Sequence, residues 1–345
     1  MSCSFWDDIQ TGGQLDLGSV DVSQNDIVRF ASEFDAQPFH TDEEAARATL
    51  LGGLSASGWH TCTLIMRLLE EAIARHSGVL ETAGLDDIIW LKPVRPGDVL
   101  SGRIRWSREA ACSCGSGARV RGADIGVRNQ HGEVVMQWRM SCLIAPPTDP
   151  RREIPKDCPI RKGRAARVLP RPGDHAIKYF EDVAPGDEIA LGEYAFTMDR
   201  IADFRARYGP GSAYDETIHP GMTYGGNETA LAWHVTAVWM HCIVRYYEHQ
   251  AARLRRQAKP VPLLGPAVGV KHLRWHLPVG MGETITFRAW AERKIETSRP
   301  DWGLLVVGAV GENRRGDTVV SFYPQMLLER RTGRCCGEAS DKPFQ

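Results

Sequence analysis

The sequence predicts an α+β protein made of two copies of one unit, each an antiparallel sheet wrapped around a central helix. Three observations predict this architecture. The chain has 345 residues, enough for two domains at roughly 100–200 residues each. Its motifs recur in the second half in the same order. Within each half, a helical apolar pattern is followed by segments in which apolar and polar residues alternate, as in strands.

The internal repeat rests on three pairs of segments. Residues 5–9 resemble 179–183, residues 58–60 resemble 232–234, and residues 90–94 resemble 275–279. The first two pairs have an offset of 174 and the third an offset of 185. Such regular offsets indicate a duplicated domain. The step between them predicts one insertion near residues 248–264, where the second half has a long basic stretch.

The segment between the two copies is unsuited to regular structure. Residues 145–174 contain seven prolines and eight Lys or Arg residues, with no apolar periodicity. Proline interrupts helices and sheet ladders, and like charges keep a segment solvated. We therefore divide the chain into a first domain at 1–145, a linker at 146–174, a second domain at 175–331 and a flexible tail at 332–345.

The first half begins with helical patterns. Residues 23–34 are expected to form a lightly amphipathic helix, and a second, short helix is expected from Thr41, where Thr41 and Glu44 match a capping box. The longest helix is expected at residues 58–76, because its apolar residues share one face. These residues are Cys62, Ile65, Met66, Leu69, Ala72 and Ile73.

Strands follow the long helix in each half. The apolar members of the alternation are Leu100, Ile104 and Trp106 in the first half and Ile285, Phe287 and Ala289 in the second. A period of two places one side of a strand in the core. Turn signals at residues 96–98 and 131–132 separate the strands, and the last strand of the first half is expected to end near Ile144.

The composition excludes several classes of protein. Lys plus Arg number 42 and Asp plus Glu number 43, whereas dedicated nucleic-acid binders usually carry a strong basic excess. No apolar run reaches the roughly 18–20 residues of a membrane-spanning helix. Residues 1–10 lack the charged start and apolar core of a signal peptide. We therefore expect a cytoplasmic protein without nucleic-acid or membrane partners.

The nine cysteines are expected to be the reduced thiols of a cytosolic protein. Their spacing is unlike that of zinc sites, because the close pairs Cys112 and Cys114, and Cys335 and Cys336, lack companion His or Cys residues at ligand distances. No metal site is expected, and a redox or metal role is the alternative.

Residues 30–42 carry the candidate chemistry. Asp35 and His40 are five residues apart, with Pro38 between them. Proline disfavours the α conformation of the residue before it, Gln37, so the chain turns here. The carboxylate and the imidazole can then converge, and together they form an acid/base pair that works near neutral pH. From the spacing alone, an Asp and a His in a loop are usually capping and hydrogen-bonding residues.

This segment resembles the signature of the MaoC-like acyl dehydratases, which are (R)-specific enoyl-CoA hydratases with the hot-dog fold. The matching residues are Asp35, Gln37, Pro38, His40 and Asp42, followed by Gly52, Gly53, Ser57 and Gly58. The resemblance covers essentially the whole chain as a tandem (double) hot-dog, but the motif is complete only in the first half. The family commonly has Asn where Gln37 stands and His where Ser57 stands, which leaves the acyl-chain preference open.

The resemblance implies reversible hydration of a trans-2-enoyl thioester, with Asp35 and His40 as the catalytic pair. It also implies that the N–H of Gly58 stabilises the charge that develops on the thioester oxygen. Close packing at the start of a helix is the alternative reason for a glycine at this position. Other residues expected near the substrate are Gln37, Ser57 and Trp59, although a tryptophan at this place is also typical of the core. Lys92, Arg95 and Arg103 are candidates for binding the phosphates of coenzyme A, with a solvated surface charge as the alternative for each. No separate cofactor is expected, since coenzyme A is part of the substrate. Acyl carrier protein is the alternative carrier.

The second half lacks the acid/base pair. At the offset of 174 the two positions hold Gly209 and Tyr214. Asp215 and His219 could form a shifted pair, although they are four residues apart and lie past the matching turn. One active site per chain is therefore expected, with the second half as a wall and the loop at 209–227 shaping the pocket. A homodimer of the whole chain is compatible with this arrangement.

Three other functions stay open from the sequence. A hot-dog thioesterase usually has a carboxylate on or near its central helix, and this helix has none before Glu70. A hydratase of branched or dicarboxylic acyl-CoA, such as mesaconyl-CoA, belongs to the same reaction class. A non-catalytic acyl-CoA-binding subunit is the third, and the intact pair of Asp35 and His40 argues against it.

Overall fold

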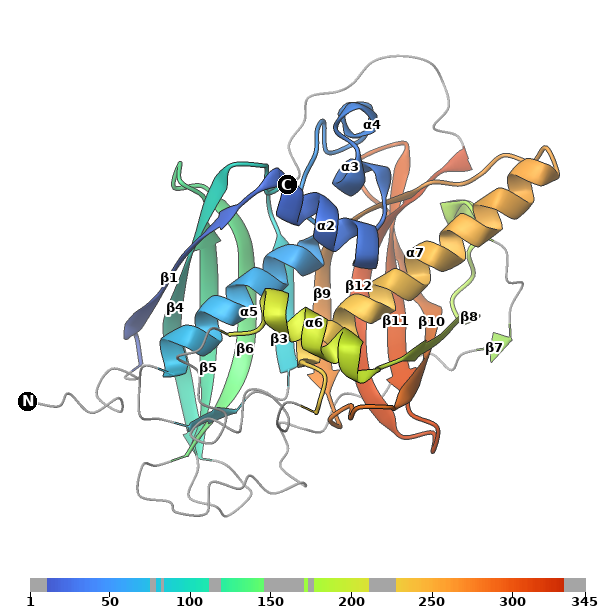
Figure 1. Cartoon of the computed structure of the whole chain (residues 1–345). Helices are drawn as coiled ribbons and strands as arrows, with labels where there is room; N and C mark the ends of the chain where they lie inside the picture. Colours follow the sequence, from blue (N-terminus) through green and yellow to red (C-terminus); the bar gives the residue numbers. More distant parts are fainter. Residues whose placement is uncertain are drawn as a thin grey trace, which may run out of the picture.

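The computed structural model describes residues 11–74, 79–81, 84–111, 119–145, 171–172, 177–210 and 228–331. Its strands form one sheet in the order β1-β4-β5-β6-β3-β9-β12-β11-β10-β8-β7, with β2 paired to β6 (Figure 1). The first strands are β1 (Gln14–Val22), β2 (Val79–Glu81), β3 (Gly84–Trp90), β4 (Asp98–Ala111), β5 (Arg119–Arg128) and β6 (Val134–Ala145). The later strands are β7 (Arg171–Pro172), β8 (Asp187–Ala195), β9 (Leu264–Trp275), β10 (Thr284–Ile295), β11 (Trp302–Glu312) and β12 (Thr318–Glu329).

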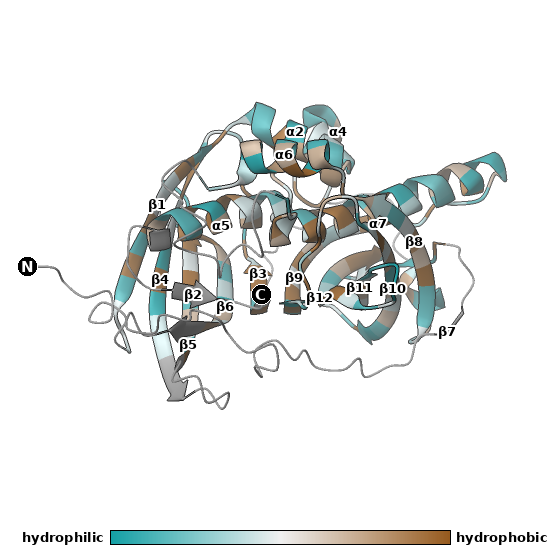
Figure 2. Ribbon diagram, turned by 60° about the horizontal axis from the view of Figure 1, so that its bottom comes forward, coloured by the Kyte–Doolittle hydropathy of each residue, from teal (hydrophilic) through white to brown (hydrophobic). Residues whose placement is uncertain are grey.

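The helices lie on one face of the sheet, which curves around them (Figures 1 and 2). The central helices of the two halves are α5 (Gly58–Ala74) and α7 (Ala232–Arg256). The other helical elements are α2 (Gln24–Phe34), α3 (Pro38–Thr41), α4 (Glu43–Arg47), the 3₁₀ turn η2 (Phe180–Asp182) and α6 (Met198–Tyr208). None of the helices in the described part of the chain has the length and apolar character needed to cross a membrane.

The two halves meet at an antiparallel pairing of β3 with β9, in which Ile88 lies opposite Val270 and Leu85 opposite Leu273. Outwards from this junction the strand order is β6-β5-β4-β1 on one side and β12-β11-β10-β8 on the other. These neighbours are all antiparallel. Each half thus wraps its own strands around its own helix, and the chain is the predicted double hot-dog.

The predicted inward-facing residues of the strands are buried. They are Leu100, Ile104 and Trp106 in β4 and Ile285, Phe287 and Ala289 in β10. Five residues of the apolar stripe of α5 are buried in the same core, namely Cys62, Ile65, Met66, Leu69 and Ala72. Figure 2 shows the same division, with hydrophobic residues concentrated where helices and strands face each other.

The start of α2 confirms the predicted helix at 23–34. Its N-cap is Ser23, whose side chain accepts a hydrogen bond from the N–H of Asp26. The predicted start of a helix at Thr41 is wrong. Pro38 opens α3, so Thr41 is its last residue, and the carboxylate of Asp42 caps α4 by accepting from the N–H of Ala45 at 2.8 Å. Proline is well suited to a first helical position and Asp to an N-cap, so together they move the boundary by one residue.

The insertion in the second half lengthens a helix. The central helix α7 has 25 residues, whereas α5 has 17. Its last turns carry Arg253, Arg255 and Arg256, all exposed, and this end is hydrophilic in Figure 2. The insertion expected near residues 248–264 therefore extends the helix before the chain turns back into β9.

Several predicted segments lie outside the described residues. They include most of the linker at 146–174, the tail at 332–345 and residues 211–227 of the second-half loop. Three cysteines fall in the described part, namely Cys62, Cys142 and Cys242, and these are buried free thiols. Burial raises the pKa of the Cys62 thiol, so this group is not poised for thiolate chemistry.

Candidate active site

Local sequence places Asp35 and His40 on either side of a sharp turn. Helix α2 ends at Phe34, and Asp35 is its C-cap residue. Gln37 is extended, with φ −79° and ψ 145°, as the proline after it requires. Pro38 then starts α3, whose single turn carries the imidazole of His40 back towards Asp35.

Asp35 and His40 face each other inside the protein. Nε2 of His40 lies 3.5 Å from Oδ2 of Asp35, and both side chains are buried. Nδ1 of His40 lies 2.7 Å from the carbonyl oxygen of Ser55. A carbonyl only accepts hydrogen bonds, so Nδ1 carries the hydrogen and, in the neutral ring, Nε2 is an acceptor. Burial lowers the pKa of His40, against the opposing effects of Asp35 and of the bond to Ser55.

The carboxylate of Asp35 is held on both oxygens. The amide nitrogen of Gln37 donates to Oδ1 at 2.8 Å, and the hydroxyl of Ser57 donates to Oδ2 at 2.7 Å. Ser57 in turn accepts a hydrogen bond from the N–H of Trp59 at 3.2 Å, in the first turn of α5. The structure thus brings Gln37 and Ser57, both expected near the substrate, into direct contact with the acid/base pair.

A cavity of about 340 Å³ opens beside this pair and is lined by both halves of the chain. Its lining includes Asp35, Gln37, His40, Gly58, Trp59 and Lys92 from the first half and Met240, Ala267, Lys271 and Gln325 from the second. The second-half residues come from α7, β9 and β12. Sequence reasoning missed these four residues, because their role follows from the pairing of β9 with β3 and from no local motif.

The N-terminus of α5 points its first residues at the cavity. Gly58 lies in the lining and is the first residue of the helix, so its N–H has no partner within the helix. The indole of Trp90 packs against Gly58, where an added Cβ would lie 2.5 Å from it. Trp59 is buried, lines the cavity and contacts Trp90 edge to face, with ring centroids 5.7 Å apart.

The three basic residues predicted to meet phosphates lie in different places. Lys92 lines the cavity with a half-exposed side chain and pairs with Glu133. The guanidinium of Arg95 donates to the carbonyls of Gly53 at 2.6 Å and Leu54 at 3.1 Å, so it supports the loop that leads to Ser55.

Arg103 lies elsewhere. Its guanidinium pairs with Asp16 of the neighbouring strand β1 at 2.8 Å, and both side chains are largely exposed. Arg103 is not among the described residues that line the cavity. The second-half residue Lys271 does line the cavity, and its half-exposed side chain pairs with Asp87 at 3.1 Å.

The second half has no carboxylate at the position that corresponds to Asp35. Gly209 is the C-cap of α6, as Asp35 is the C-cap of α2. Tyr214 and the shifted pair of Asp215 and His219 lie outside the described residues.

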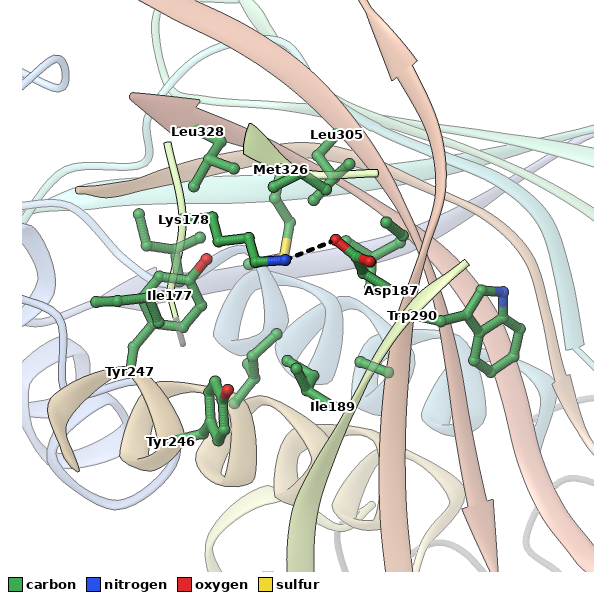
Figure 3. A pocket seen from close by; sticks show the side chains of 16 residues that line it. Ile177, Lys178, Asp187, Ile189, Tyr246, Tyr247, Trp290, Leu305, Met326 and Leu328 are labelled. Atoms are coloured by element: carbon green, nitrogen blue, oxygen red, sulfur yellow. Dashed lines mark hydrogen bonds and ion pairs between the residues drawn. The ribbon is translucent and has the colours of Figure 1, made fainter. Parts of the chain in front are cut away.

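A second, smaller pocket of about 70 Å³ lies inside the second half (Figure 3). Apolar side chains such as Ile189, Leu305 and Met326 form most of its wall, and an ion pair joins Lys178 to Asp187 at 3.0 Å. It borders α7, β9 and β12, as the first cavity does, but the two share no lining residue. It has no acid/base pair comparable to that of Asp35 and His40 among its lining residues.

Comparison with known proteins identifies the family. The model of the MaoC-like domain matches residues 9–116, which include the acid/base pair. The uncharacterized protein YdeM of Bacillus subtilis (strain 168) is 34% identical over 94 residues, which is 27% of this chain and 67% of that protein.

Solved structures share the whole architecture. A protein of Chloroflexus aurantiacus assigned as a MaoC domain dehydratase superposes with a TM-score of 0.65 at 14% identity, covering 96% of this chain and 98% of that one. Rv0216 of Mycobacterium tuberculosis, which has a double hot-dog fold, superposes with a TM-score of 0.63 at 15% identity, covering 94% and 98%. With the motif-bearing half matched in sequence and the whole chain matched in fold, the protein belongs to the MaoC-like dehydratase family.

Proposed function

We propose that the protein reversibly hydrates trans-2-enoyl thioesters, with Asp35 and His40 binding the reacting water. One observation carries the proposal. Oδ2 of Asp35 and Nε2 of His40 are both hydrogen-bond acceptors, and they face each other at 3.5 Å on the wall of a cavity. Two acceptors attract a molecule that donates twice, and a water molecule does so while keeping its oxygen lone pairs free.

This arrangement suits addition of water to a conjugated double bond. As the water oxygen attacks the β-carbon, Asp35 accepts one of its protons and His40 holds the other. Asp35 then returns that proton to the α-carbon on the same face, which regenerates the carboxylate and completes the addition of water. The same two groups serve the reverse reaction, in which the 3-hydroxyl of the substrate takes the place of the water.

Charge that develops on the thioester oxygen needs a fixed donor. The N-terminus of α5 supplies one, since its first N–H groups are unpaired within the helix and its dipole is positive at this end. Gly58 lines the cavity at this point. We assign its N–H to the thioester oxygen, because glycine lets the substrate approach the backbone closely.

The rest of the cavity suits an acyl thioester. Its apolar lining includes Leu51, Val94 and Met240, which fit an acyl chain. Lys92 and Lys271 lie where the cavity meets solvent, with side chains 50% and 41% exposed. They are the residues best placed to meet the phosphates of coenzyme A or of an acyl carrier protein arm.

The test is a spectrophotometric screen of trans-2-enoyl-CoA substrates of increasing chain length, together with mesaconyl-CoA, that follows loss of the conjugated thioester absorbance. Asp35→Asn should lower kcat by about 10²- to 10⁴-fold, because an amide cannot accept the proton. Asp26→Asn, which removes a carboxylate from the surface of the same helix α2, should retain wild-type turnover.

Other outcomes would overturn the proposal. Release of free thiol without formation of a 3-hydroxyacyl thioester would identify a thioesterase. Binding of the thioesters without any turnover would identify a non-catalytic subunit. Near wild-type turnover by Asp35→Asn would remove Asp35 from the mechanism.

A further inference from the structure

The side chain of Ser57 makes two hydrogen bonds, one to the backbone of α5 and one to the carboxylate of Asp35. Ser57 is the N-cap of α5, fully buried, and its hydroxyl oxygen accepts from the N–H of Trp59. The same hydroxyl donates to Oδ2 of Asp35 at 2.7 Å, across 22 residues of sequence. Among the described residues, Ser55, Ala56 and Gly58 line the cavity but Ser57 does not. Ser57 therefore contacts the carboxylate of Asp35 on the side away from the cavity in which a substrate would lie.

The hydrogen bond from Ser57 affects the charge of Asp35 because of where Asp35 lies. As the C-cap of α2, Asp35 lies at the negative end of a helix dipole, where a carboxylate is disfavoured. Ser57 links it to the N-terminus of α5, where a negative charge is favoured. Among the residues that the structure describes, the titratable side chain that faces Asp35 is His40, and the other side chains that bond to the carboxylate, Gln37 and Ser57, are neutral.

The second half provides an internal comparison. The position that corresponds to Ser57 is Leu231, which is the N-cap of α7 and makes no side-chain capping bond. The position that corresponds to Asp35 is Gly209. A central helix of this fold therefore forms without a capping hydroxyl, and the hydroxyl and the carboxylate are absent together. This pattern indicates that the hydroxyl of Ser57 serves the carboxylate of Asp35, because the helix itself can form without it.

We propose that Ser57 is a positioning residue for Asp35. Its hydroxyl holds Oδ2 opposite Nε2 of His40 and couples the carboxylate to the positive end of α5. With Gln37 on Oδ1, it prevents rotation of the carboxylate and leaves the remaining lone pair of Oδ2 for the reacting water. The role in turnover rests on the proposed hydratase function, whereas the effect on the carboxylate does not.

The decisive variant is Ser57→Ala. It should fold, bind thioesters with a nearly unchanged KM, and lose about 10- to 100-fold in kcat, because a carboxylate that is no longer fixed misplaces the water. The acid limb of its pH–rate profile should move up by about one pH unit, because a carboxylate that has lost a hydrogen bond attracts a proton more strongly, either on itself or on the facing Nε2 of His40. A purely structural role would leave the acid limb in place.

The matched control is Thr63→Val. Thr63 is also buried in α5, and its hydroxyl bonds to the backbone carbonyl of Trp59, with no contact to Asp35. This variant should keep the wild-type kcat and pH profile. Equal losses in Thr63→Val and Ser57→Ala, with unmoved acid limbs, would overturn the proposal, as would wild-type kinetics of Ser57→Ala.

A readout without substrate separates this proposal from the hydratase function. The infrared band of the protonated carboxyl of Asp35, assigned by its absence in Asp35→Asn, should appear at a higher pH in Ser57→Ala than in the wild type. If the wild type hydrates no enoyl thioester but this difference is seen, the proposed function fails and the coupling of Ser57 to Asp35 stands. Identical titrations of the band would overturn the coupling.

Discussion

At the scale of single residues, His40 serves as an acceptor because of two neighbours. The carbonyl of Ser55 holds the ring hydrogen on Nδ1, so Nε2 faces Asp35 without one. Burial keeps the ring neutral by lowering its pKa from the ordinary value of 6.5. Protonation would turn Nε2 into a donor, and the site would then lose one of the two acceptors that we propose bind the water.

This tautomer predicts the pH dependence of turnover. The pKa of His40 is lowered, so the ring stays neutral at and above pH 6.5 and kcat should be flat there, falling only at lower pH. Stopped-flow hydration rates across this range, taken before any acid unfolding, would measure it. A rate that rises as the pH falls would show that the imidazolium is the working form.

At the scale of elements, the start of α5 depends on close packing against β3. Trp90, the last residue of β3, lies where any side chain at Gly58 would have to go. The contact fixes the distance between the helix terminus and the strand, and this in turn fixes where the first N–H groups of α5 point. A glycine at this position is therefore required by space, not by an unusual backbone conformation.

Gly58→Ala should consequently cost both stability and activity. Its methyl group forces Trp90 or the helix to move, at about 1–3 kcal/mol of unfolding free energy, and moves the proposed thioester donor. Urea unfolding and kcat together would measure the effect. The matched control is Gly126→Ala in β5, where the added methyl meets open space, and this variant should resemble the wild type. Wild-type behaviour of Gly58→Ala would show that the helix start tolerates displacement.

At the scale of the whole molecule, the duplication has left one histidine at the same place in each half. His60 stacks on Phe30 with ring centroids 4.8 Å apart, and His234 stacks on Phe204 at 4.3 Å. Among the described residues, no group hydrogen-bonds to the ring nitrogens of either histidine. Burial lowers the pKa of each to about 3, so both are neutral in the folded protein.

These two histidines predict acid lability. Between the ordinary pKa of 6.5 and the folded value of about 3, the unfolded chain binds protons that the folded chain does not. Stability should therefore fall as the pH drops through this window, by up to a few kcal/mol for each histidine. The double variant His60→Leu and His234→Leu should flatten the dependence, measured by urea unfolding from neutral pH to about 4. His249→Leu, at an exposed position, should not; equal slopes for all three proteins would contradict the assignment.

Much of the architecture was predictable because local sequence patterns determine it. The period of apolar residues marks α5 and β4, and the cap at Ser23 marks the start of α2. The boundary near Thr41 was predicted wrongly because two capping signals adjoin there, and Pro38 decides between them by starting α3 early. Arg103 was expected near the phosphates because it lies on a strand of the motif-bearing half. The alternation within a strand, however, does not show which face of the sheet or which end of the strand borders the cavity, and Arg103 instead pairs with Asp16.

The sequence by itself determined the duplication, the α+β class and the loss of the acid/base pair from the second half. Repeats, periodicity and residue identity are properties of the linear chain, so they can be recognised without the tertiary structure. Only the tertiary structure decided that Ser57 contacts Asp35, that Arg95 supports the loop beside His40, and that Lys271 enters the same cavity. These contacts join residues far apart in the chain. They follow from the packing of α2 against α5 and from the pairing of β3 with β9, and side-chain packing between distant segments leaves no periodic trace in a sequence.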